Sequence, residues 1–145
     1  MTETPDVLLV EDNPGDVRLT EEALDEAETD VRLHVVSDGV EALSFLSGAD
    51  EYAGAATPDV ILLDLNLPRK GGEEVLEAIQ EDASLPTPPV IVLTSSDTDE
   101  DVARSYELSA NAYLTKPVAP EEFIETIRRF ESFWLSTAQL PPEGG

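Results

Sequence analysis

Short apolar segments recur along the chain, and stretches with helical spacing lie between them. Residues 60–63 and 90–93 are continuous apolar runs, typical of strands that are buried on both faces of a parallel sheet. Residues 31–36 alternate between apolar and polar positions and are rich in β-branched side chains, which also predicts a strand. Two further short strands are predicted at residues 6–10 and 111–115. The pattern therefore predicts five strands.

Five helices are predicted to alternate with these strands. The first is expected to begin at Asp16, where apolar residues start to recur at helical spacing. Asp97 or Thr98 is expected to cap the fourth helix, because acidic residues follow three positions later. Pro120 is well placed at the first position of the last helix. Strands that alternate with helices predict an α/β fold, a doubly wound parallel sheet.

The domain organisation is expected to be simple. Residues 1–140 are predicted to form one domain that ends in an extended C-terminal helix. The Pro- and Gly-containing tail at residues 141–145 is predicted to be disordered.

Polar side chains come directly after four of the predicted strands. Glu11 and Asp12 follow the first strand, Asp64 follows the third, Thr94 the fourth and Lys116 the fifth. The carboxyl ends of parallel strands meet at one edge of the sheet, where ligands bind in such folds. Three carboxylates that close together repel one another unless a divalent cation balances them, and oxygen ligands suit Mg²⁺. The sequence therefore predicts a magnesium site at this edge.

The same placement predicts phosphoryl chemistry. The acidic pair would hold Mg²⁺, with the backbone carbonyl of Asn66 as a further ligand. Asp64 would bind the metal with one oxygen and attack phosphorus with the other, forming an acyl phosphate. The metal, Lys116 and the Thr94 hydroxyl would contact the three phosphoryl oxygens. Taken singly, each residue is also explained as a turn former or a surface group, so the prediction rests on their joint placement.

Several segments resemble the signature of response-regulator receiver domains, and the resemblance runs from about residue 5 to about residue 135. The segments are Leu9–Asp12, Leu62–Pro68 with Gly72, Leu93–Ser95 and Tyr113–Pro117. Residues 11–16 and the Phe133-Trp134-Leu135 ending further resemble regulators paired with cyanobacterial phytochrome-type kinases and their haloarchaeal relatives. The resemblance implies the flavodoxin-like receiver fold, with the strand order 2-1-3-4-5.

The resemblance also implies roles for individual residues. Asp64 matches the phosphoacceptor, and Thr94 and Tyr113 match the hydroxyl and aromatic side chains that reorient together on phosphorylation. The bond between Lys116 and Pro117 is expected to be cis, as in the family. Gly71 departs from the family pattern, which often has Asp or Asn there, so the third helix is expected to have a weaker cap.

The partners implied are a sensor histidine kinase and a downstream protein that the sequence does not identify. The output surface would comprise the fourth helix, the fifth strand and the fifth helix. A symmetric homodimer is also predicted, with four apolar residues near the C-terminus as its contacts: Phe130, Phe133, Trp134 and Leu135.

The charge of the chain changes this picture in one respect. Acidic residues outnumber basic ones 32 to 8, which gives a formal net charge of -24. Such a surface repels nucleic acid and, at low salt, repels itself. Concentrated salt screens this repulsion, with a Debye length of roughly 3 Å at 1 M, so we predict that the protein works in the cytoplasm of a salt-accumulating halophile.

The sequence also lacks other features. Cysteine is absent, no apolar run is long enough to cross a bilayer, and no leader is expected.

Two other functions compete with a stand-alone signalling receiver. An aspartyl phosphatase would use Asp64 as a turnover nucleophile, but such enzymes commonly place a second acid two residues later, where this chain has Asn66. A pseudo-receiver would fold without being phosphorylated, and the complete set of acids, Thr94 and Lys116 argue against it. His34, the only histidine, lies mid-strand away from the acidic edge and is expected to be an ordinary strand residue.

Overall fold

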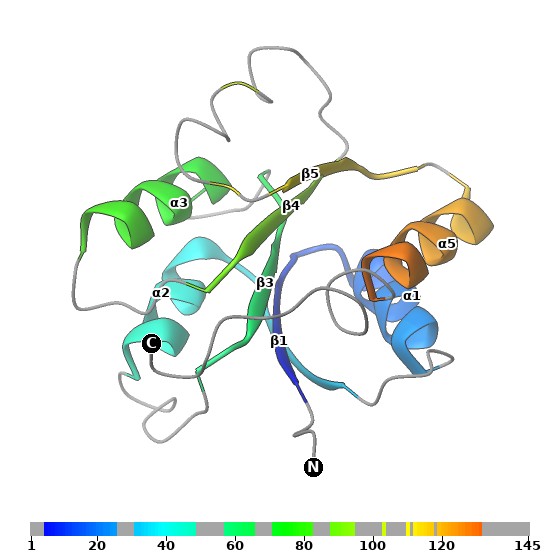
Figure 1. Ribbon diagram of the computed structural model, residues 1–145, viewed down its shortest axis with the longest axis horizontal. Coiled ribbons are helices and arrows are strands. Elements are labelled where there is room, and N and C mark those ends of the chain that lie inside the picture. The colour runs from blue at the N-terminus through cyan, green and yellow to red at the C-terminus, as the bar shows by residue number, and fades with distance from the viewer. Residues whose placement is uncertain are drawn as a thin grey trace.

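The structure, a computed structural model, is built around one parallel sheet (Figure 1). It describes residues 5–25, 31–48, 57–65, 71–82, 88–94, 103, 110, 112–117 and 119–131. The strands are β1 (Asp6–Val10), β2 (Arg32–Val36), β3 (Val60–Leu63), β4 (Val90–Thr94) and β5 (Ala112–Thr115). They pair in the order β2-β1-β3-β4-β5, and every pairing is parallel. The predicted fold class and strand order are confirmed.

Helices cover both faces of the sheet. The described helices are α1 (Pro14–Asp25), α2 (Gly39–Ser47), α3 (Gly72–Glu81) and α5 (Pro120–Phe130). In Figure 1, α1 and α5 lie side by side on one face, and α2 and α3 lie on the other. Of the predicted fourth helix the structure describes only Ala103, which is helical; the rest falls outside the described residues. None of the helices in the described part of the chain is long and apolar enough to cross a membrane.

The three central strands form the middle of the core. Every residue of β1, β3 and β4 is buried, whereas the edge strands β2 and β5 are partly exposed. Alternate residues of the central strands belong to two apolar clusters, one beneath α2 and α3 and the other beneath α1 and α5. This burial on both faces explains why 60–63 and 90–93 are unbroken apolar runs.

Helix α1 begins two residues earlier than the apolar spacing predicts. The Asn13 side-chain oxygen accepts hydrogen bonds from the backbone N–H groups of Gly15, at 2.9 Å, and Asp16, at 3.3 Å. Asn13 thus acts as the N-terminal cap, and Pro14 takes the first helical position, where its missing N–H is not needed. The polar first turn carries no apolar signal, so periodicity alone placed the start at Asp16.

A second charged cluster lies at the amino end of the sheet. Asp6, which is 6% exposed, accepts hydrogen bonds from Arg32 Nε at 2.9 Å and Nη2 at 3.1 Å, and bonds His34 Nε2 at 2.9 Å. Burial alone would raise the pKa of Asp6, but the hydrogen bonds and charges of Arg32 and His34 outweigh it and lower that pKa. The His34 ring also packs against Phe45, with centroids 5.3 Å apart. His34 is therefore a partnered strand residue that secures the edge strand β2.

Phe130 belongs to the core rather than to an interface. Its side chain is 2% exposed and packs in the cluster beneath α1 and α5. The prediction that Phe130 contributes to a dimer contact is therefore wrong: at the end of α5 its ring faces the sheet and leaves no free surface. The other predicted dimer residues, Phe133, Trp134 and Leu135, lie outside the described residues.

Gly72 allows α3 to start directly against the segment that carries Asp64. A Cβ atom at position 72 would lie 2.5 Å from the Asp64 carbonyl oxygen and 2.6 Å from the Leu65 Cα. The Gly72 N–H donates to the Leu65 carbonyl at 3.1 Å, which keeps the two backbones in contact. The preceding Gly71 is the N-terminal cap residue and makes no side-chain cap bond, as its sequence predicted. Among the described residues, a Cβ atom there would meet only the Leu65 carbonyl oxygen, at 3.7 Å.

Replacing Gly72 with alanine is expected to destabilise the protein by about 1–3 kcal/mol, because backbone must move to make room for the methyl group. Gly71→Ala is the matched control and should change stability by less than about 0.5 kcal/mol, since its site is open. Urea unfolding followed by circular dichroism measures both. Equal stabilities for the two variants would show that the close approach at Gly72 is not a constraint.

Candidate functional site

Backbone hydrogen bonds continue one residue past three of the strands and position the side chains that follow. The N–H of Glu11 donates to the carbonyl of Val36 at 3.0 Å, and the N–H of Asp64 donates to Val10 at 3.1 Å. The N–H of Lys116 likewise donates to the carbonyl of Thr94, at 2.7 Å. Each side chain therefore leaves the sheet from a fixed point at its carboxyl edge.

Three carboxylates converge at this edge, as predicted. Glu11, Asp12 and Asp64 each offer one oxygen, and these oxygens all lie within 4.8 Å of one another. Glu11 and Asp64 are 3% and 6% exposed, whereas Asp12 is open to solvent. Such a half-buried group of oxygen ligands fits a single hard cation such as Mg²⁺, with the exposed side left for water.

Lys116 is the positive counterpart of this cluster. Its ammonium donates hydrogen bonds to Glu11 Oε1, to Asp64 Oδ2 at 3.1 Å and to Asp16 Oδ2 at 2.8 Å. The lysine side chain is only 9% exposed. Three carboxylates thus contact one ammonium, and the Asp12 carboxylate lies close to two of them, so their excess negative charge leaves room for a doubly charged ion.

Asp16 is the site residue that sequence reasoning missed. It lies in the first turn of α1, where it was taken for the start of a helix, and its carboxylate nevertheless reaches Lys116. The signal that points to it is the Asn13-Pro14 pair. A cap at Asn13 places Asp16 in the first turn, directly beside the end of β1.

The buried charges shift the pKa values of their neighbours. Burial and the nearby charge of Asp64 raise the pKa of Glu11 to about 7, although the Lys116 ammonium acts in the opposite direction. Burial would lower the pKa of Lys116, but the hydrogen bonds to Asp16 and Glu11 and the charges of Glu11 and Asp64 raise it well above its ordinary value. Lys116 therefore stays charged over the whole neutral range, while Glu11 titrates within it.

Thr94 and Tyr113 lie on one face of the sheet, on neighbouring strands. Tyr113 pairs with Val92, and Thr94 is the next residue of β4 on that same face because side chains alternate along a strand. Thr94 is completely buried, and Tyr113 is half-buried against the cluster beneath α2 and α3. The two side chains are therefore placed next to each other along the face, one strand apart.

Two further predictions concern the Lys116–Pro117 peptide bond and the Asn66 carbonyl. The bond between Lys116 and Pro117 is trans, since no cis peptide bond occurs among the described residues, so the predicted cis bond is wrong here. Trans is the intrinsically favoured isomer of an X–Pro bond, by about 0.5–1 kcal/mol. A cis bond forms only where contacts in the folded protein outweigh that preference. The Asn66 carbonyl, predicted as a metal ligand, lies outside the described residues.

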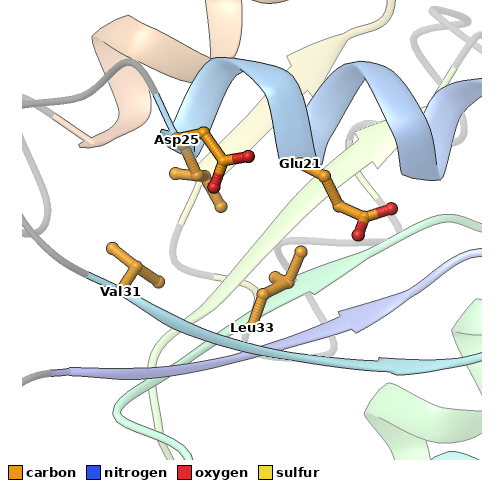
Figure 2. Close-up of a pocket in the computed structure, with 5 residues that line it drawn as sticks. Glu21, Asp25, Val31 and Leu33 are labelled. Carbon is orange, nitrogen blue, oxygen red and sulfur yellow. The ribbon is translucent and has the colours of Figure 1, made fainter.

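A separate hollow of about 380 Å³ lies between α1 and the beginning of β2. In Figure 2 the carboxylates of Glu21 and Asp25 project from α1 over Val31 and Leu33. Its lining includes none of the carboxylates of the acidic cluster, and Asp25 marks the end of α1 farthest from that cluster. The converging charged groups at the carboxyl edge, rather than this hollow, define the candidate site.

Comparisons with known proteins point to one family. The sequence pattern of the response regulator receiver domain matches residues 7–128. Response regulator Rcp1 of a Synechocystis species is 44% identical over 135 residues, which are 93% of this chain and 92% of that protein. The crystal structure of the phosphorylated cyanobacterial phytochrome response regulator RcpA has a TM-score of 0.92 at 44% identity, covering 97% of this chain and 100% of that one. The Mn²⁺-bound form of response regulator Rcp1 has a TM-score of 0.90 at 43% identity, covering 95% and 99%.

The raised pKa of Glu11 predicts that Mg²⁺ binding depends on pH. A cation needs the carboxylate form of Glu11, and protonation removes that form as the pH falls below about 7. With one competing proton, the dissociation constant is expected to be about tenfold larger at pH 6 than at pH 8.

Isothermal titration calorimetry across this range, in buffers of different ionisation enthalpy, measures both the affinity and the proton released. In Glu11→Gln the remaining binding should lose this pH dependence. An affinity that is equal at pH 6 and pH 8 in the unsubstituted protein would contradict the assignment.

Proposed function

The chain belongs to the response regulator receiver family, and we propose that it accepts a phosphoryl group on Asp64 from a sensor histidine kinase. The observation that carries this proposal is the convergence of a buried Lys116 ammonium and three carboxylates on one point, with Asp64 in contact with the ammonium. An isolated turn-forming aspartate would have neither the burial nor the charged partners.

The proposed reaction is a transfer of a phosphoryl group between two side chains. A carboxylate oxygen of Asp64 forms a bond to phosphorus while the bond from phosphorus to the kinase histidine nitrogen breaks. Lys116 already donates to Asp64 Oδ2 and is placed to neutralise the charge that arrives with the phosphoryl oxygens. Bound at the acidic cluster, Mg²⁺ supplies the remaining positive charge.

Glu11, Asp12 and Asp64 are the residues proposed to hold the metal, with the Asn66 carbonyl as a further ligand. The oxygen ligands, their burial and their mutual distances support Mg²⁺. A related protein, Rcp1, has a structure described as a Mn²⁺-bound form. An ion of this kind at the same edge would explain why so many acids gather there.

Signalling is proposed to follow from Thr94 and Tyr113. The two side chains occupy one face of β4 and β5, so a movement of the Thr94 hydroxyl toward a phosphoryl group leaves space beside the Tyr113 ring. Phosphorylation then biases a two-state equilibrium at the surface that includes β5 and α5, where a downstream protein binds. The similarity to regulators described as phytochrome response regulators supports a phytochrome-type kinase as the partner.

Turnover of a separate substrate is less well supported than signalling. Aspartyl phosphatases commonly place a second acid two residues after the nucleophile as the general acid, and this chain has Asn66 at that position. A pseudo-receiver is disfavoured because oxygens of all three carboxylates lie within 4.8 Å of one another and the lysine contacts two of these carboxylates, Glu11 and Asp64.

Incubation with Mg²⁺ and acetyl phosphate, followed by intact-mass measurement, tests the proposed function. The unsubstituted protein is expected to gain one phosphoryl group, and Asp64→Asn is expected to gain none. Asp25→Asn, which removes the same charge from the far end of α1, is the control and should be phosphorylated normally. If the unsubstituted protein stays at its original mass, the pseudo-receiver is the better description.

We also propose that the acidic surface adapts the protein to concentrated salt and that Phe133, Trp134 and Leu135 support a symmetric dimer. The net charge of -24 supports the first proposal, and the apolar character of these three residues in an acidic chain supports the second. Sedimentation at high salt distinguishes the dimer from a monomer.

The salt proposal predicts that the urea midpoint rises as KCl increases from about 0.1 M to about 2 M, because screening weakens the repulsion between acidic groups. Most of the rise should occur below about 1 M, where the Debye length has already fallen to roughly 3 Å. Chloride is preferred to sulfate in this test, since sulfate stabilises most proteins by exclusion from their surfaces. A midpoint that is flat or falls with KCl would refute the adaptation.

A further inference from the structure

Lys116 has a full set of hydrogen-bond partners. An ammonium group carries three N–H donors, and the Lys116 ammonium meets three carboxylates: Glu11, Asp16 and Asp64. Its long, flexible stem would otherwise allow many rotamers, so the position of the ammonium depends on these contacts. The question is which of the three contacts sets that position.

The three partners are not equivalent. Glu11 and Asp64 both belong to the cluster of oxygens that fits a cation, and Asp64 is also the proposed phosphoacceptor. Both therefore change their bonding when a cation or a phosphoryl group arrives. Asp16 is not part of that cluster, and its contact with Lys116, at 2.8 Å, does not compete with either event.

Asp16 is itself held firmly. Its backbone N–H donates to the Asn13 cap, and its carbonyl accepts a hydrogen bond of 2.8 Å from the hydroxyl of Thr20, which is 1% exposed. Asn13 in turn donates its backbone N–H to Glu11 Oε2 at 3.2 Å. The first turn of α1 is thereby tied to the end of β1, and its N-terminal dipole also favours a carboxylate at this position.

We infer that Asp16 is a positioning residue that anchors the Lys116 ammonium at the carboxyl edge while the partners Glu11 and Asp64 are exchanged during phosphoryl transfer. The inference rests on the proposed function of Asp64. Without Asp16 the ammonium is left to the two metal-cluster carboxylates, and its position then varies with their occupancy. Misplacement of a charge-stabilising group by about 1 Å can slow a reaction by about a hundredfold, so a loss of tenfold or more in phosphorylation rate is expected.

The scarcity of lysine makes this inference directly observable. The chain contains two lysines, Lys70 and Lys116, so ¹⁵N-lysine labelling gives two ammonium signals by NMR. Lys70→Arg leaves one signal and assigns it. A buried, hydrogen-bonded ammonium exchanges slowly with water, so the Lys116 signal reports the anchoring without depending on activity.

The experiment compares Asp16→Asn with Asp25→Asn, which removes the same charge from the other end of α1. Asp16→Asn should shift or broaden the Lys116 ammonium signal in the metal-free protein and should slow phosphorylation by acetyl phosphate and Mg²⁺ about tenfold or more. Asp25→Asn should match the unsubstituted protein in both measurements. Asp16→Glu keeps the charge and should restore part of the rate and of the signal.

An unchanged Lys116 signal in Asp16→Asn, or an unchanged phosphorylation rate, overturns the inference. If the unsubstituted protein is not phosphorylated, the proposed function fails, and with it the part of the inference that concerns phosphoryl transfer. A Lys116 signal that still changes in Asp16→Asn then supports the anchoring of the ammonium by Asp16 alone. Circular dichroism checks that Asp16→Asn remains folded. If it does not, Asp16→Ser takes its place, and an unchanged Lys116 signal in that variant overturns the inference.

Discussion

The parallel hydrogen-bond ladder determines where the charged groups of this protein lie. The ladder continues beyond the strands through the N–H groups of Glu11, Asp64 and Lys116, each bonded to the last residue of a neighbouring strand. A shift of one residue in any strand would turn its site side chain to the opposite face and break the cluster. The buried apolar strands β1 and β3 fix that register, so core packing and site geometry depend on the same contacts.

Charge balance is the second constraint, and it explains the burial of Lys116. An ammonium at 9% exposure is unfavourable alone, and so is a group of buried carboxylates, but each offsets the other. The balance is incomplete because three carboxylates contact one lysine and a fourth, Asp12, lies in the same acidic cluster. That residual negative charge suits the edge to a cation, and burial together with the charge of Asp64 raises the pKa of Glu11 to about 7.

Most of the fold and much of the site followed from the sequence, because apolar runs end where polar chemistry begins. The runs before Glu11, Asp64 and Thr94 located the strand ends, and parallel topology brought those ends together. Asp16 was missed because its role arises from a helix cap, which apolar periodicity does not record. Phe130 was assigned to an interface because helical spacing does not say which face a ring covers, and the prolyl isomer at Pro117 depends on tertiary contacts that no local pattern contains.

At Gly72 the backbone at the start of α3 packs directly against the backbone of Asp64 and Leu65, so the positions of the helix and of this segment depend on each other. The backbone of the helix start rests on the Asp64 carbonyl with no side chain between them. Transplanting the segment that carries Asp64 onto another scaffold would require the first turn of α3 to be moved with it. Conversely, grafting a foreign helix in place of α3 would alter the position of the Asp64 backbone even if every charged residue were retained.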